Sequence, residues 1–328
     1  MGRPPHPAVP VHQGPGAEKA RGAGEEHTAF YRLDLRGGEA QKAFEVPLSA
    51  SLLEKADEGV YLLAVDWDLR FSKAHQLKGG AKEALLKEKK EEKDYQVLDE
   101  MPFYFNGAGY VNKHRDALFL YEESSGKLTR VTKEAFSTGS AHLSPDGKQV
   151  LFTGQSYTVK RKNKSGVYVY DRETGRTTEL LKPRAYDLYD ALWWGEKILL
   201  LATDGKRYGL NENAQFYTLD PASGEVALLA PYEDALGSSV GSDCRLGGGR
   251  EWVQEGDKLY FVTTLGAPLR CTAWKRLGKS APCTPRPARW TASTRRKVPF
   301  TLWACRTGSC KSCTAGTAAP RNGTSSPP

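Results

Sequence analysis

A repeated hairpin pattern limits the fold of this chain more than any other feature of its sequence. Four segments share an alternating apolar strand, a turn and a glycine at a constant offset: Phe30–Gly38, Leu118–Gly126, Val167–Gly175 and Phe216–Gly224. In the last three, equivalent residues recur every 49 positions, at Tyr121, Tyr170 and Leu219. Alternation with a period of two residues before such a turn predicts an antiparallel hairpin.

A second apolar strand precedes the later hairpins. Each copy begins at a glycine: Gly59–Val65, Gly147–Thr153, Gly195–Leu201 and Gly256–Val262. Units of about 40–50 residues made of short antiparallel strands are typical of β-propeller blades, whereas a β-sandwich would not produce this repeat. Burial between neighbouring blades also explains strands that are apolar on both sides, such as Ile198–Ala202. We therefore predict an all-β fold, a partial β-propeller of four-stranded antiparallel blades, over residues 25–266.

One predicted blade carries an insertion at about residues 70–112. Residues 81–93 within it are rich in Ala, Leu, Glu and Lys, which favour a helix. We expect a short exposed helix whose charges face solvent. The segment Asn106–Gly109 predicts a turn, because its glycines accept positive φ.

The two ends of the chain differ from its centre. Residues 267–328 contain twelve Lys or Arg and no Asp or Glu, so the net charge of +8 belongs to this segment. The repeat requires another strand soon after residue 264, and we expect none. Residues 1–24 are rich in Pro and Gly. Both ends are predicted to be disordered, or translated out of frame, because neither can bury enough apolar surface to fold.

Composition also restricts the function classes. No run of 18 apolar residues is present, and the N-terminus lacks the apolar centre of a secretory signal. One cysteine, Cys244, precedes residue 267, which fits a reducing compartment. We expect a cytoplasmic protein that has no membrane partner.

The basic segment contains two patterns that resemble binding sites. Three cysteines, with Cys283 as a fourth, have spacings that could be read as a zinc site: Cys305, Cys310 and Cys313. Cations and stacking surfaces of the kind that bind nucleic acids are supplied by Trp274, Trp290, Trp303 and Arg295–Lys297. Since no recognisable fold surrounds either pattern, we predict no metal, no cofactor and no specific nucleic-acid partner.

One segment, Gly237–Gly241, matches the nucleophile elbow G-x-S-x-G with Ser239 at its centre. A nucleophile elbow needs a strand before the serine, a helix after it, and then an acid and a histidine in chain order. The preceding Pro231–Leu236 is no buried strand, and the last histidine in the chain is His142. We predict a loop between blades and no catalytic residue in this chain.

The stretch Tyr95–Asn112, YQVLDEMPFYFNGAGYVN, carries a family resemblance. It is similar to the V-x-D-E-x-P-F-W-F-N-G-x-G-F segment in the propellers of acylaminoacyl-peptidase-like members of the prolyl oligopeptidase family, with Tyr104 where Trp is frequent. Further matching pieces are Leu201–Arg207, Leu210–Asn213 and Ser239–Gly249. The resemblance spans about residues 25–266, and it is strongest to bacterial members.

This resemblance implies a two-domain serine peptidase in which a propeller gates a C-terminal α/β-hydrolase domain. The present chain would be the non-catalytic gating propeller, inactive alone, with peptide substrates reached through a hydrolase domain that this chain lacks. Some family members bind the substrate amine with propeller carboxylates, which makes candidates of Glu91, Glu92, Asp99 and Glu100. For Glu91 and Glu92, an exposed helix face is the competing interpretation.

A different function class is a freestanding propeller that acts as a protein-interaction scaffold. DNA downstream that encodes a hydrolase favours the peptidase hypothesis, and unrelated DNA favours the scaffold. In either case an unclosed ring would expose edge strands and promote self-association.

Overall fold

The computed structural model describes residues 8–11, 25–34, 37–95, 97–236, 252–255, 258–264, 269–275 and 279–282. The chain divides into two units, which are described separately. The first comprises residues 1–212 and 216–228, and the second comprises residues 213–215 and 229–328. Within the described part, no helix has the length and apolar character needed to cross a membrane.

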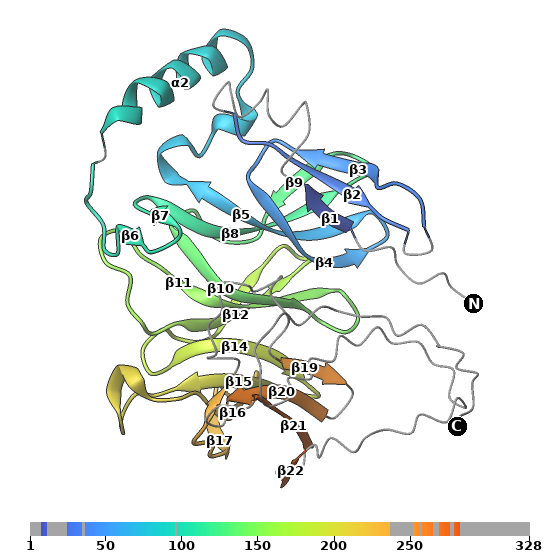
Figure 1. The fold of residues 1–328 in the computed structure, drawn as a ribbon, viewed down its shortest axis with the longest axis vertical. Coiled ribbons are helices and arrows are strands. Elements are labelled where there is room, and N and C mark those ends of the chain that lie inside the picture. Colours follow the sequence, from blue (N-terminus) through green and yellow to red (C-terminus); the bar gives the residue numbers. More distant parts are fainter. Residues whose placement is uncertain are drawn as a thin grey trace, which may run out of the picture. The chain divides into compact units, whose positions relative to one another are not determined.

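The first unit contains three four-stranded sheets whose neighbouring strands follow chain order (Figure 1). The first consists of β4 (Ala50–Asp57), β5 (Val60–Asp68), β8 (His114–Glu122) and β9 (Lys127–Arg130). The second consists of β10 (Phe136–Leu143), β11 (Gln149–Ser156), β12 (Gly166–Asp171) and β13 (Thr177–Leu181). The third consists of β14 (Asp187–Trp194), β15 (Lys197–Thr203), β16 (Gln215–Leu219) and β17 (Val226–Ala230).

Two further sheets differ from this pattern. A three-stranded sheet consists of β1 (Ala8–Val11), β2 (Thr28–Arg32) and β3 (Gln41–Val46). A five-stranded sheet in the second unit consists of β18 (Ala235–Leu236), β19 (Trp252–Glu255), β20 (Lys258–Thr264), β21 (Leu269–Lys275) and β22 (Lys279–Pro282).

The strands β1, β21 and β22 lie where the sequence led us to expect none. β21 pairs with the whole of β20, from Lys258↔Lys275 to Thr264↔Leu269, and β1 pairs with β2. Sheet pairing uses backbone groups, so an unpaired edge can accept a strand of unusual composition. Apart from these strands, residues 1–24 and 267–328 lie outside the described residues, and their predicted disorder or altered reading frame stays a prediction.

The predicted insertion connects β5 to β8. It contains η1 (Leu69–Phe71), η2 (Ala74–Gln76), α2 (Gly79–Glu91), η3 (Glu92–Asp94), β6 (Tyr104–Phe105) and β7 (Gly109–Tyr110). A short helix η4 (Gly209–Asn211) follows β15. The exposed helix expected over residues 81–93 is present as α2, which begins two residues earlier and buries none of its residues.

The 49-residue repeat corresponds to the third and fourth strands of consecutive sheets. Tyr121 pairs with Leu128 across β8 and β9, and Tyr170 pairs with Thr177 across β12 and β13, again 49 residues later. In the second of these turns the Asp171 carboxylate accepts the backbone N–H of Thr174 at 2.7 Å. The carboxylate therefore closes the turn locally, which explains why this turn chemistry recurs with the repeat.

Alternate side chains of each inner strand pack against different neighbouring sheets. In β5, Tyr61, Leu63 and Val65 join a core shared with the three-stranded sheet, whereas Leu62 joins a core shared with β10 and β11. In β15, Leu199 and Leu200 point to opposite faces and are both fully buried. Each fully buried aliphatic side chain contributes about 1.5–3 kcal/mol, so burial on two faces stabilises sheets that have little surface of their own.

A tight contact between β10 and β11 provides a stability test. A Cβ added to Gly154 would lie 2.3 Å from the Ser137 carbonyl oxygen and 2.6 Å from the Phe136 ring, at φ +149°. Gly154→Ala should lower the free energy of unfolding in urea by about 2 kcal/mol or more. As a control, Gly80→Ala in α2 meets open space and should cost nothing. Equal urea midpoints for the two variants would contradict this account.

Candidate interaction surface

The long connections of the first unit leave its sheets at one end of the strands. The residue pairs that mark this end are Asp68↔His114, Gly154↔Gly166 and Asp187↔Thr203. Residues 69–113, 157–165 and 204–212 extend from it, and we call these three segments the loop end (Figure 1). The short turns that hold the repeated glycines lie at the opposite, turn end of the strands.

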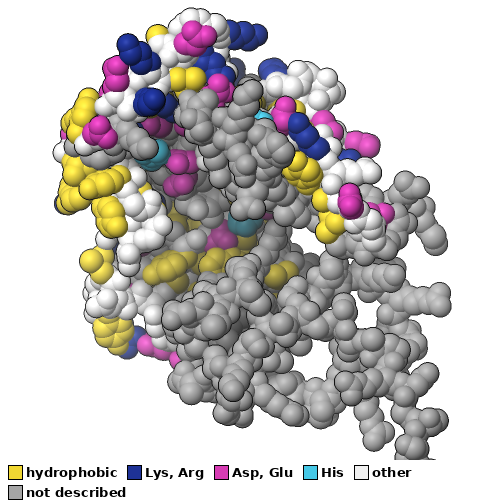
Figure 2. Space-filling model, turned by 45° about the horizontal axis from the view of Figure 1, so that its top comes forward, with side chains coloured by type: hydrophobic (Ala, Val, Ile, Leu, Met, Phe, Trp, Pro, Cys, Tyr) yellow, Lys and Arg dark blue, Asp and Glu magenta, His cyan; other side chains and the backbone are white. Residues whose placement is uncertain are grey.

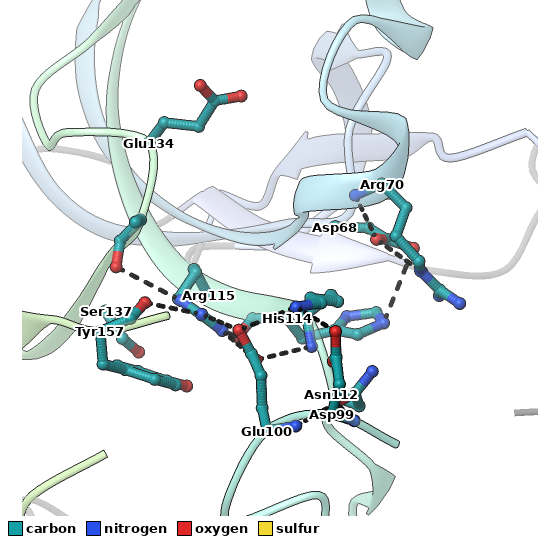
Figure 3. A network of polar contacts seen from close by, with 12 residues as sticks. Asp68, Arg70, Asp99, Glu100, Asn112, His114, Arg115, Glu134, Ser137 and Tyr157 are labelled. Carbon is teal, nitrogen blue, oxygen red and sulfur yellow. Dashed lines mark hydrogen bonds and ion pairs between the residues drawn. The ribbon is translucent and has the colours of Figure 1, made fainter. Parts of the chain in front are cut away.

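A buried ion pair fastens the insertion to its sheet (Figure 3). Arg115 of β8 donates Nη2–H to Oε1 of Glu100 at 2.7 Å and Nη1–H to Oε2 at 3.1 Å. The two side chains are 0% and 1% exposed. Burial raises the pKa of Glu100, but the Arg115 donors and the Lys113 backbone N–H outweigh burial and lower that pKa. The Glu100 carboxylate is therefore ionised at neutral pH.

The same guanidinium group joins three separate segments. Its Nη1 donates to the His114 carbonyl at 2.8 Å, its Nη2 to the Tyr157 carbonyl at 2.9 Å, and its Nε to the Ala135 carbonyl at 3.3 Å. The Tyr157 ring lies 3.7 Å from the guanidinium carbon, a cation–π contact. One side chain thus holds β8, the connection before β10 and the segment 157–165 together.

Asn112 folds the insertion back on itself. Its Oδ1 accepts the backbone N–H of Glu100 at 3.1 Å, and its Nδ2 donates to the Val97 carbonyl at 2.6 Å. The next residue, Lys113, has a φ of 63°, and its ammonium lies 2.9 Å from an Asp99 carboxylate oxygen. Residues 97–100 are consequently held against the start of β8.

The insertion also pairs with the segment 157–165. The Met101 backbone N–H donates to the Val159 carbonyl at 2.8 Å, and the Arg161 N–H donates to the Met101 carbonyl at 2.8 Å. Gln155, which is 5% exposed, bonds the backbone of Lys162 in both directions. Both segments are therefore ordered by bonds from buried side chains.

Exposed apolar side chains gather at the loop end. They are Tyr95, Val97, Leu98, Met101, Phe103, Tyr104, Phe105, Tyr110, Val159, Tyr208 and Leu210. The other large exposed apolar residues in the described part are Tyr189 in β14, Leu228 and Val253. In Figure 2 the hydrophobic side chains, drawn in yellow, concentrate along the left edge of the view. Apolar surface of this extent commonly marks a site for another protein surface.

The four carboxylates considered as substrate ligands each lie beside a cation of this chain. Glu100 bonds Arg115, Asp99 lies at Lys113, and Glu91 lies 3.8 Å from Lys87 on the exposed α2. Glu92 lies 4.0 Å from Arg70. The buried Glu100 is thereby committed to a structural pair, while the turn expected at Asn106–Gly109 is present between β6 and β7.

The sequence did carry a signal for the partner of Glu100. In β8 the inward positions alternate, and Arg115 occupies one of them among apolar residues. An arginine at an inward strand position requires a buried acceptor, although spacing alone does not identify which one.

Several sequence candidates lie outside the described residues. These are Ser239 and Cys244, the cysteines Cys283, Cys305, Cys310 and Cys313, Trp290, Trp303 and Arg295–Lys297. Trp274 lies in β21, where only the backbone is described. Among the described residues, no group of His, Cys, Asp and Glu could hold a metal ion.

A second polar cluster links the first strands of three successive sheets. His142 of β10 lies 2.9 Å from Asp190 of β14 through Nε2 and 3.3 Å from Glu54 of β4 through Nδ1. Burial by itself would lower the pKa of His142, but the two carboxylates outweigh it and raise that pKa to about 9. A charged imidazole therefore bridges the three sheets at neutral pH.

The comparisons with known proteins concern the fold. No family model matches the sequence, and no curated protein matches it. The uncomplexed acylaminoacyl peptidase of Pyrococcus horikoshii is similar with a TM-score of 0.50 and 16% identity, over 78% of this chain and 36% of that one. The β-propeller domain of the Trilobed protease from Pyrococcus furiosus has a TM-score of 0.45 and 13% sequence identity. That match covers 84% of this chain and 66% of the other. TolB from Acinetobacter baumannii has a TM-score of 0.44 and 14% sequence identity, and the match covers 79% of this chain and 49% of TolB.

At 13–16% identity, the likeness to these solved structures covers most of this chain and concerns the fold alone. The β-propeller predicted from the repeat is confirmed. The chain spans about a third of the acylaminoacyl peptidase that it resembles in structure.

Breaking the buried ion pair should destabilise the protein strongly. Arg115→Leu leaves the Glu100 carboxylate buried without its partner, which costs about 3–5 kcal/mol in the free energy of unfolding measured with urea. A matched control is Lys87→Gln, which removes an exposed pair on α2 and should cost less than about 0.5 kcal/mol. Similar losses in the two variants would show that the buried pair does not hold the insertion.

The His142 cluster should make stability depend on pH. The pKa of His142 is raised from 6.5 to about 9 in the folded state, so its contribution is fully present below about pH 6.5. It is lost as the pH rises through about 9, with an amplitude of up to about 3 kcal/mol. Urea unfolding between pH 6 and pH 10 should show this loss in the wild type and not in His142→Gln. Parallel pH profiles for the two proteins would contradict the assignment.

Proposed function

We propose that this chain is the non-catalytic propeller of a serine oligopeptidase and that it gates access of peptides to a hydrolase domain. The observation that carries the proposal is the exposed apolar surface of residues 95–110, which the buried Arg115–Glu100 pair holds in place. The propeller fold and the family-like stretch Tyr95–Asn112 support it. The catalytic groups in this proposal belong to the hydrolase domain, and peptides are its substrates.

The gating role follows from the order of the loop end. An apolar surface whose backbone is already fixed loses little conformational entropy when another domain covers it. A hydrolase domain docked there would exclude water from the aromatic side chains and leave substrates a restricted path. Short unfolded peptides would pass and folded proteins would not. The single cysteine before residue 267 supports a reducing, cytoplasmic compartment for this work.

A freestanding propeller is the second candidate, because the same apolar surface would serve a protein partner. The DNA that follows the gene distinguishes this candidate function from the peptidase proposal. For the peptidase proposal, a reading frame downstream should encode a G-x-S-x-G elbow followed by an acid and a histidine. The purified chain should not hydrolyse aminoacyl or peptide nitroanilides. Turnover by this chain would overturn the proposal, and unrelated downstream DNA would favour the scaffold.

Docking of the hydrolase domain can be tested with two matched substitutions. Phe105→Glu places a charge within the apolar surface, whereas Leu228→Glu places the same charge at an exposed apolar site outside the loop end; the two side chains are 45% and 52% exposed. When the chain is co-expressed with the downstream hydrolase domain, Phe105→Glu should reduce the recovered complex at least about tenfold, since a buried unpaired charge costs several kcal/mol. Equal recovery of both variants would exclude this surface.

A further inference from the structure

A hollow at the loop end lies between the segment 157–165 and the connection that follows β13. Its volume is about 290 Å³, and it is lined by Gln155, Ser156, Tyr157, Thr158, Val159, Lys160, Lys162 and Pro183. The residues that line it carry three hydroxyl groups (Ser156, Tyr157 and Thr158) and two ammonium groups, and no carboxylate lines it. Its chemistry is that of a site for a small anionic group.

The cations of the hollow are available to a ligand. The Lys160 and Lys162 residues are exposed, and both line the hollow. In the sequence, Arg161 stands between these two lysines, and Lys182 and Arg184 flank Pro183, which lines the hollow. The two chain segments that border the hollow therefore carry five cations, and an excess of positive charge of this kind attracts anions.

The hollow is ordered before any ligand arrives. Gln155 accepts the Lys162 backbone N–H at 3.0 Å and donates to the Lys164 carbonyl at 3.0 Å. Arg115 holds the Tyr157 carbonyl at 2.9 Å and stacks on its ring. The segment that carries Lys160 is therefore fixed at both ends by buried side chains, which reduces the entropy lost on binding.

Apolar side chains border the cations. Val159 and Met101 are 66% and 54% exposed, and their backbones pair directly beside Lys160. A ligand that contacts both features needs a carboxylate next to an apolar side chain. Peptides that alternate acidic and apolar residues have this chemistry, because consecutive side chains of an extended peptide point to opposite sides and reach both features. A nucleic acid would satisfy the charges and leave the aliphatic surface without a partner.

We propose that this hollow binds peptide segments in which a Glu or Asp carboxylate lies next to apolar side chains, with Lys160 and Lys162 as the carboxylate ligands. The inference rests on the proposed function in one respect: peptides are the substrates there, so the hollow would select acidic ones among them. Ser156 and Thr158 would donate hydroxyl hydrogen bonds to the same carboxylate, and Val159 and Met101 would contact its apolar neighbours.

Fluorescence anisotropy with the full chain tests this proposal without any hydrolysis. The probe is a short fluorescein-labelled peptide in which glutamate alternates with leucine, measured against the same peptide with glutamine. The glutamate peptide should bind at least about fivefold more tightly. The double variant Lys160→Gln, Lys162→Gln should lose about fivefold in affinity, because it removes the two partly exposed ion pairs that these lysines would form with the peptide carboxylates. The matched control Lys127→Gln, Lys148→Gln removes the same charge at the turn end and should bind like the wild type.

Three results would overturn the proposal. These are equal binding of the two peptides, unchanged affinity in the Lys160 and Lys162 variant, or an equal loss in the control variant. Stronger binding of a single-stranded oligonucleotide of the same charge, abolished by the Lys160 and Lys162 substitutions, would assign the hollow to nucleic acid instead. Failure of the downstream DNA to encode a hydrolase leaves the peptide binding standing, so the two proposals fail separately.

Discussion

The arrangement of the loop end depends on the buried pair between Arg115 and Glu100. Taking both charges out of water is unfavourable, and the pair is tolerated because carbonyl groups and a backbone N–H satisfy the hydrogen-bonding groups that remain. Those additional bonds lead to the segment 157–165, to the connection before β10 and to the start of β8. One polar contact therefore orders a surface whose outward side chains are largely exposed to solvent.

The sheets beneath supply the rigid frame that this contact needs. Each inner strand is buried on two faces, so its ends cannot shift without disturbing two cores. The short turns with repeated glycines and the long connections then separate to opposite ends of the strands. The longest connections leave at the loop end, where the insertion between β5 and β8 carries most of the exposed aromatic residues of the described part. The position of the candidate surface is thus a consequence of the blade topology.

The loop end combines features that in separate places would mean little. Exposed lysines are common on protein surfaces, and single exposed apolar residues need no explanation. Here the apolar side chains, the exposed cations and an ordered backbone occur together, and buried side chains at Gln155 and Arg115 maintain the order. The His142 cluster lies elsewhere, between the first strands of three sheets, and it makes the stability of the protein depend on pH.

Much of this could be predicted before the structure was known. The hairpins, their 49-residue spacing, the exposed helix and the turn at Asn106–Gly109 all follow from local periodicity and turn chemistry, which act over a few residues. The pairing of Glu100 with Arg115, the bridging of Glu54 and Asp190 by His142, and the strands β1, β21 and β22 did not follow. These features join residues far apart in the chain, or add a strand to an existing edge. Their energy comes from burial and shared hydrogen bonds, which exist after the sheets have assembled and leave no periodic trace in the sequence.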